Sequence, residues 1–101
     1  MLSVLFKTKK ATADLQKSID QTVRSMAKDF FTEVKRLTPV RSGLAKRSWK
    51  LKRKSRSQYA VDNPQPYIDR LDTGYSNQAP RGMTRPALRE VKDKYRNRRI
   101  K

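Results

Sequence analysis

Residues 63–88 read NPQPYIDRLDTGYSNQAPRGMTRPAL, and this stretch contains four of the five prolines and two of the three glycines of the chain. Residues 59–85 carry three basic and three acidic side chains and are therefore neutral, whereas the whole chain has a net charge of +17. Proline restricts backbone angles and glycine frees them, so this pattern is typical of a loop with a specified shape. We expect this stretch at the geometric centre of the fold, with the other elements arranged about it.

Two helices are predicted within and after this stretch. Pro66 suits the first turn of a short helix over residues 67–72, and Pro86 suits the first turn of a C-terminal helix. The last six residues, 96–101, are expected to form a basic tail. The apolar stripe of the C-terminal helix consists of Leu88, Val91 and Tyr95.

A long amphipathic helix is predicted upstream, over residues 12–37. Thr12 can cap its start, and Pro39 disfavours helical angles at the residue before it, so the helix should end near Leu37. Residues 1–10 are interpreted as an N-terminal arm, either frayed or reaching a neighbouring subunit. Apolar side chains recur on one face of the helix. They are Leu15, Ile19, Val23, Met26, Ala27, Phe30, Phe31, Val34 and Leu37.

The region between these helices predicts two strands. Basic side chains alternate with Trp49 and Leu51 over residues 46–53, which favours a strand with these two apolar residues facing the core. A second strand is expected over residues 58–63, with Tyr59 and Val61 inward. The chain is thus predicted to be a single α+β domain over residues 1–101. It comprises a long N-terminal amphipathic helix, a small antiparallel sheet with a basic hairpin, a short helix and loop, and a C-terminal helix.

Composition excludes several kinds of chemistry. The chain has no cysteine and no histidine, which excludes disulfides, thiolate nucleophiles, the common zinc sites and the usual general base near neutral pH. Asp69 and Asp72 are spaced as a carboxylate pair but have no third ligand nearby, so we interpret them as surface carboxylates. The apolar N-terminal stretch, residues 1–6, is too short to span a membrane. We therefore expect no enzyme activity, no metal and no cofactor.

The basic side chains between residues 39 and 58 are the candidate functional site, because eight of them occur there without one acidic residue. Such a cluster favours phosphate contact, while an acidic protein partner and a solvated face are the alternatives. The predicted polyanion-facing or DNA-facing residues are Arg41, Lys46, Arg47, Lys50, Lys52, Arg53, Lys54 and Arg56.

Short motifs in the middle of the chain resemble the tail-completion or neck proteins of long-tailed bacteriophages, including the minor tail protein Z-like members. The motifs occur in the family's order over residues 38–90, although Arg41 stands where the family often has an acidic residue. The matching residues are Thr38-Pro39, Gly43-Leu44, Ser48-Trp49, Asn63, Tyr67, Leu71, Gly74 and Pro86-Ala87-Leu88.

This resemblance implies a structural virion protein of the phage neck or tail top, made in the host cytoplasm. It implies a homo-oligomeric ring, expected to be a hexamer, that joins tail to head around the DNA channel. Its expected partners are neighbouring neck, tail-terminator and head-closure proteins, and the phage DNA without sequence specificity. We expect the subunit interface at Tyr67, Leu71, Gly74, Tyr75, Gln78, Pro80 and Gly82, in or beside the neutral loop.

Two alternatives from other classes stay open at this point. A toxin-type ribonuclease is similarly small and basic, and Tyr59, Tyr95 and Arg98 are its conceivable functional groups. A monomeric nucleoid-type or ribosomal nucleic-acid-binding protein would also explain the charge.

Overall fold

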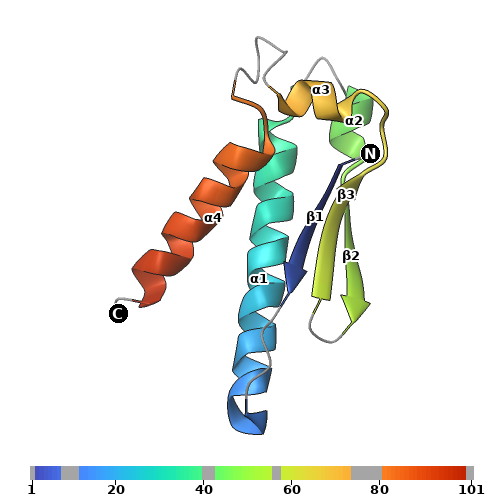
Figure 1. Ribbon diagram of the computed structural model, residues 1–101. Helices are drawn as coiled ribbons and strands as arrows, with labels where there is room; N and C mark the ends of the chain where they lie inside the picture. Colours follow the sequence, from blue (N-terminus) through green and yellow to red (C-terminus); the bar gives the residue numbers. More distant parts are fainter. Residues whose placement is uncertain (1, 8–11, 40–42, 56–57, 74–80, 100–101) are drawn as a thin grey trace.

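The structure, a computed structural model, describes residues 2–7, 12–39, 43–55, 58–73 and 81–99, without the side chains of residues 13, 14 and 97–99. Its elements in chain order are β1 (Leu2–Lys7), α1 (Ala13–Leu37), α2 (Gly43–Arg47), β2 (Lys50–Ser55), β3 (Gln58–Asn63), α3 (Ile68–Asp72) and α4 (Thr84–Arg99). The mixture of a long first helix, a small antiparallel sheet and a C-terminal helix confirms the predicted α+β fold (Figure 1).

The sheet has three antiparallel strands in the order β1-β3-β2. β3 is the central strand, and five of its six residues are buried. The predicted β2–β3 hairpin pairing is confirmed, and Tyr59 and Val61 are buried as expected. Ala60 and Asp62, on the opposite face of β3, are buried as well, because strands flank β3 on both sides.

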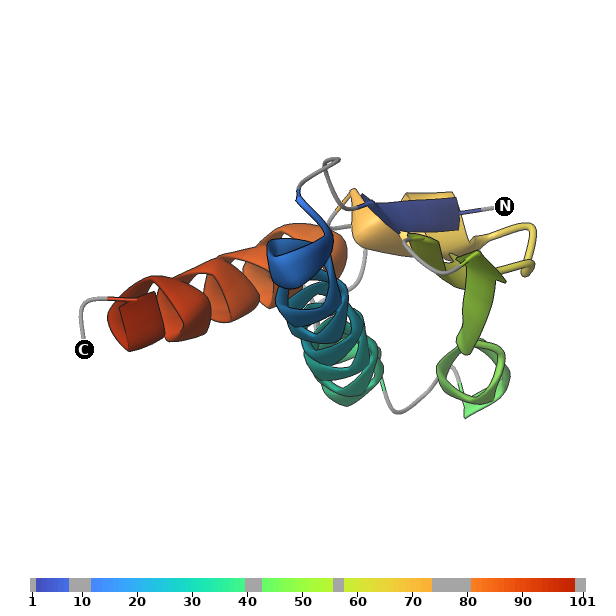
Figure 2. The same cartoon turned by 90° about the horizontal axis from the view of Figure 1, so that it is seen from below.

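The long helix α1, and not the stretch 63–88, lies at the centre of the molecule. The sheet packs on one side of α1 and α4 on the other (Figures 1 and 2). Phe30 and Val34 of α1 are fully buried, and the ring of Phe30 lies 5.4 Å from that of Phe6 in β1. The prediction of a shaped central loop was therefore wrong about the centre, because the apolar stripe of α1 buries side chains from both flanks.

The predicted bounds of α1 are confirmed, since Thr12 and Thr38 occupy its N-cap and C-cap positions. The side chain of Thr12 makes no capping hydrogen bond. With 25 residues α1 is about 37 Å long, whereas each six-residue strand spans only about 20 Å. The N-terminal half of α1 consequently extends beyond the sheet, and Leu15, expected on the apolar face, is 58% exposed.

The N-terminal residues form a strand where an arm was expected. β1 pairs with β3 along its whole length, from Leu2 opposite Asn63 to Lys7 opposite Gln58. Leu2, Val4 and Phe6 are the half-buried residues of its alternating pattern and pack against the core. The two strands are separated by about fifty residues of chain, so local reasoning from the terminus could not find this pairing.

The first predicted strand begins later than expected. Residues Gly43–Arg47 form α2, a single helical turn, and β2 begins only at Lys50. Ala45 of α2 is fully buried and joins the core cluster with Trp49. Residues 46–53, which were predicted as one strand, therefore comprise the end of a helical turn and the start of β2.

The C-terminal elements follow the prediction closely at their starts. α3 and α4 lie where helices were expected, and Ala87, Val91 and Tyr95 of α4 belong to the core. α4 continues to Arg99, so most of the predicted basic tail is helical.

Candidate functional site

The face of the sheet turned away from α1 is the candidate polyanion interface. Directly opposed residues of an antiparallel sheet share a face, and Phe6 identifies the face that meets α1. The outer face is therefore made by the other set of alternating residues. They are Ser3, Leu5 and Lys7 of β1, Gln58, Ala60 and Asp62 of β3, and Lys50 and Lys52 of β2.

The acidic residue on the outer face is occupied by a hydrogen bond. The carboxylate of Asp62 is buried and accepts from the hydroxyl of Ser3. Beside it, Ala60 is a small residue between Leu5 and Lys52, and Leu5 is 47% exposed. Lysines with exposed side chains thus surround a small apolar centre, and the outer face presents a net positive charge.

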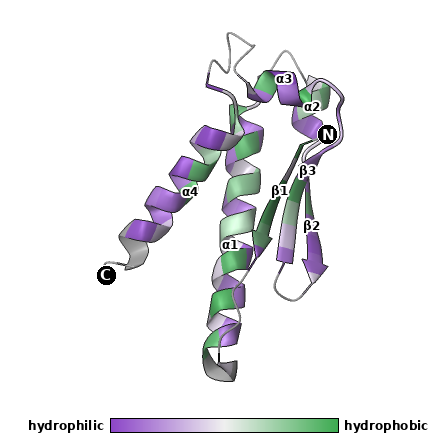
Figure 3. Ribbon diagram, viewed as in Figure 1, coloured by the Kyte–Doolittle hydropathy of each residue, from purple (hydrophilic) through white to green (hydrophobic). Residues whose placement is uncertain are grey.

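The predicted polyanion-facing residues do not all lie on the outer face. Lys50 and Lys52 do, and Lys54 lies at a bulge where the register shifts between Arg53 and Ser55. Arg53 opposes Tyr59 on the face that meets α1, but its side chain is exposed. Figure 3 shows β2 as mostly hydrophilic and β1 as hydrophobic.

The other predicted members of this set are separate from β2. Lys46 and Arg47 belong to α2. Arg41 and Arg56 lie outside the described residues. The structure adds Lys7, which the sequence interpretation placed in an arm; apolar residues at 2, 4 and 6 with polar ones at 3 and 7 were a partial strand signal, which Leu5 interrupts.

A buried polar network lies at the end of the sheet next to α2. The indole Nε1 of Trp49 donates to Oγ1 of Thr38 at 2.8 Å, and this hydroxyl donates to the carbonyl of Val34 at 2.6 Å. Thr38 is only 2% exposed. The C-terminal end of α1 is thereby bound to the residue that precedes β2.

Asn63 continues this network from the end of β3. Its Nδ2 donates to the carbonyl of Ala45 at 2.8 Å, and its Oδ1 accepts from the backbone N–H of Gln65 at 3.1 Å. The side chain of Gln65 donates to the hydroxyl of Ser48 at 2.8 Å. Thr38, Ser48, Trp49 and Asn63 are residues on which the phage resemblance depends, and in this structure they join α2 to the sheet.

The predicted subunit-interface residues fall partly outside the described chain. Gly74, Tyr75, Gln78 and Pro80 lie outside the described residues. Tyr67 is 38% exposed, and Leu71 is half-buried against the core. Gly82 is buried with a φ of +79°, and a Cβ at this position would lie 2.1 Å from the carbonyl oxygen of Asp72. The interface itself stays a prediction.

The carboxylates interpreted as surface groups have different surroundings. Asp69 is exposed, whereas Asp72 accepts hydrogen bonds from the backbone N–H groups of Met83 and Thr84, at 2.9 and 2.8 Å. It also accepts one from the Thr84 hydroxyl at 2.7 Å. Asp72 therefore fixes the start of α4, a role that sequence spacing did not indicate. Among the described residues no group of acidic side chains is placed to hold a metal ion.

The residues considered for a toxin-type ribonuclease are not brought together. Tyr59 lies in β3 and Tyr95 in α4, on opposite sides of α1 (Figure 2). Both are buried, and the hydroxyl of Tyr95 donates to Asp29 at 2.8 Å. The side chain of Arg98 is outside the described part. No described helix is long and apolar enough to cross a membrane.

Comparison with known proteins finds one related family. A family model described as "Bacteriophage HK97-gp10, putative tail-component" matches residues 3–74, which is more than half of the chain and extends from β1 through α3. No curated protein and no solved structure matches the chain.

Proposed function

This chain belongs to the HK97-gp10-like family of bacteriophage tail components, and we propose that it is a subunit of the neck or tail-completion ring that joins the tail to the head around the DNA channel. A structural role in the phage tail follows from the family. The ring, its sixfold copy number and its contact with DNA are the proposal.

The outer face of the sheet is the observation that carries this proposal. Lys7, Lys50 and Lys52 share it and outnumber its one carboxylate, that of Asp62, which is buried and accepts a hydrogen bond from Ser3. Lysine side chains on a regular strand contact phosphates without reading base edges. A channel that passes any genome sequence requires this kind of contact.

A ring would multiply the positive charge of each subunit. The net charge of +17 per chain makes isolated copies repel one another. A polyanion in the lumen, or an acidic neighbouring ring, would offset that repulsion. We place the outer face toward the polyanion, and the interface with the next subunit at Tyr67 and Leu71 together with the loop of residues 74–82. The neighbouring rings are the expected neck, tail-terminator and head-closure proteins.

Charge reversal on the outer face tests the proposal. Lys7→Glu combined with Lys52→Glu should block joining of heads to tails and weaken duplex DNA binding at least about tenfold. Lys50 is left unchanged because Asp62 lies directly opposite it, and a glutamate at position 50 would place two like charges side by side. The matched control is Lys17→Glu with Lys28→Glu, two exposed positions of α1 that change the net charge equally.

The position of the charge should therefore decide the outcome. Normal joining by the outer-face variant, or an equal defect in the α1 control, would contradict the proposal. Salt-sensitive DNA binding by a monomer, with normal joining, would favour the nucleic-acid-binding alternative. Light scattering at low and high salt measures the mass, and a multimer of about six copies is the expected result.

A further inference from the structure

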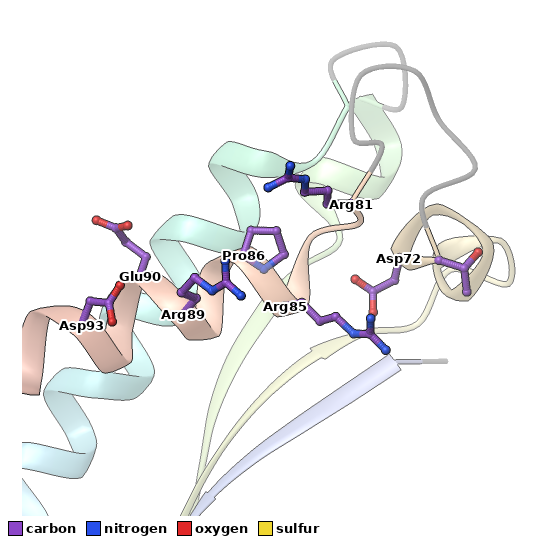
Figure 4. Close-up of a pocket in the computed structure, with 8 residues that line it drawn as sticks. Asp72, Arg81, Arg85, Pro86, Arg89, Glu90 and Asp93 are labelled. Carbon is purple, nitrogen blue, oxygen red and sulfur yellow. The ribbon is translucent and has the colours of Figure 1, made fainter.

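We propose that a groove beside the N-terminal end of α4 is a second binding site, which takes an acidic segment of another protein and not DNA. The groove measures ≈ 830 Å³ and lies beside the first turns of α4 (Figure 4). Its lining residues are Asp72, Thr73, Arg81, Arg85, Pro86, Arg89, Glu90 and Asp93.

The hydrogen bonds of Asp72 position the arginines of this groove. Its carboxylate accepts from the first backbone N–H groups of α4, including that of Thr84 at 2.8 Å. Gly82 has a positive φ, and because it lacks a Cβ the chain can pass directly against the carbonyl of Asp72. Arg81 therefore precedes a fixed helix start, and Arg85 follows it within the first turn.

Arg85 and Arg89 are one helical turn apart, about 6 Å along α4. In Figure 4 the side chains of Arg81 and Arg89 lie on either side of Pro86. All three arginines are exposed, and none donates a hydrogen bond to a carboxylate of the described chain. A guanidinium binds a carboxylate through two parallel hydrogen bonds, so the groove offers free bidentate donors.

The acidic residues of the groove argue against DNA as its ligand. Glu90 and Asp93 lie together at one end of the groove (Figure 4). A phosphate backbone carries a charge on every unit, so across the groove it would meet these two carboxylates and be repelled, whereas a protein segment can place its acidic residues at the arginines and neutral residues opposite Glu90 and Asp93. On the outer face, by contrast, the carboxylate of Asp62 is buried. The groove, which combines exposed arginines with carboxylates, suits a protein segment. The outer face, on which the exposed charged side chains are lysines, suits a phosphate backbone.

A second copy of this chain has few carboxylates to offer. Most acidic side chains that the structure describes already interact within the chain. Asp20 binds Gln16, Asp29 binds Lys94 and Tyr95, Glu33 binds Arg36, Asp62 binds Ser3, Asp72 binds the start of α4, and Asp69 also has an interaction. The remaining pair, Glu90 and Asp93, lies in the groove itself, and self-pairing through it would require twofold symmetry, which a head-to-tail ring contact lacks.

The spacing of the arginines indicates what the occupant carries. Alternate residues of an extended chain are about 6.6–6.8 Å apart, close to the separation of Arg85 and Arg89 along α4. Acidic residues at every second position of an extended segment are therefore spaced like the backbone positions of Arg85 and Arg89.

Arginine-to-lysine substitution tests this inference without changing the net charge. The probe is a fluorescein-labelled peptide of alternating Glu and Ser, with a Gln–Ser peptide as its uncharged counterpart, and binding is followed by anisotropy. Arg85→Lys with Arg89→Lys should weaken binding of the Glu–Ser peptide at least about fivefold, because lysine lacks the planar fork. Duplex DNA affinity should not change. Arg24→Lys with Arg96→Lys, at exposed positions of α1 and α4 outside the groove, is the matched control and should change neither affinity.

Each other outcome would overturn the inference. An unchanged peptide affinity in the Arg85/Arg89 variant would mean that the groove does not bind carboxylates, and equal binding of the Gln–Ser peptide would mean the same. An equal loss of DNA affinity would make the groove a phosphate site. A dimer that dissociates in this variant would identify a second copy as the occupant. None of these results depends on ring formation.

Discussion

A buried polar network and the exposed strand β2, which lies between its members in the sequence, use their polar groups differently. The polar network at Thr38, Ser48, Trp49 and Asn63 is largely buried, and its side chains bind one another or the backbone. β2 begins immediately after Trp49, and all of its residues except Leu51 are exposed. The first region therefore specifies how α2 meets the sheet, whereas the second leaves its charges available to a partner. Both regions are polar, and the burial of their side chains is what separates them.

The largest stability effect is expected for Asn63→Leu, in the buried region. The substitution keeps an approximate shape but removes the donor to Ala45 and the acceptor for Gln65. Two backbone groups lose their partners in a buried site, so the free energy of unfolding should fall by about 2–4 kcal/mol. Urea denaturation measures this. A loss below about 0.5 kcal/mol would mean that the network does not hold α2 in place.

A smaller loss is expected for Thr38→Val, which keeps the shape and removes the hydroxyl. The N–H of Trp49 then lacks its acceptor, and the free energy of unfolding should fall by about 1–2 kcal/mol. Thr38→Ser keeps the hydroxyl and is the control. Combining Thr38→Val with Trp49→Phe removes both partners, and the double variant should be more stable than the sum of the single losses predicts. Additive losses would show that the two groups do not interact.

The smallest stability effect is expected for Lys52→Gln, in the exposed strand. The free energy of unfolding should change by less than about 0.5 kcal/mol, since the lysine has no described charged partner within the chain. DNA affinity should become less dependent on salt, with the slope of log K against log salt smaller by about 1. A stability loss as large as that of Thr38→Val would remove the distinction between the two regions.

Local sequence patterns predicted much of the fold. The apolar stripe predicted α1, Thr12 and Pro39 predicted its two ends, and the β2–β3 hairpin followed from alternation. The family motifs predicted the phage relationship, although they did not indicate that Thr38 and Asn63 act through buried hydrogen bonds. The role of each motif residue became evident only from the residues that contact it in the structure.

The candidate sites were predictable only in part. The basic character of residues 46–54 was evident, but alternation places Lys52 and Arg53 on opposite faces. The arginine groove was not predicted, because Arg81 and Arg85 belong to a stretch whose net charge is zero. A net charge summed along the sequence does not reveal a site in which arginines and carboxylates from α3, α4 and the segment before α4 line one groove.

The sequence by itself determined the long helix, the central strand and the excess of positive charge, since these depend on periodicity and composition within short windows. Only the tertiary structure decided that β1 joins the sheet and brings Lys7 to the face that carries Lys52. The physical reason is burial. Phe6 packs on Phe30, and this contact is consistent with the strand register that exposes the alternate residues. Contacts between distant segments select that register, and no short stretch of sequence contains them.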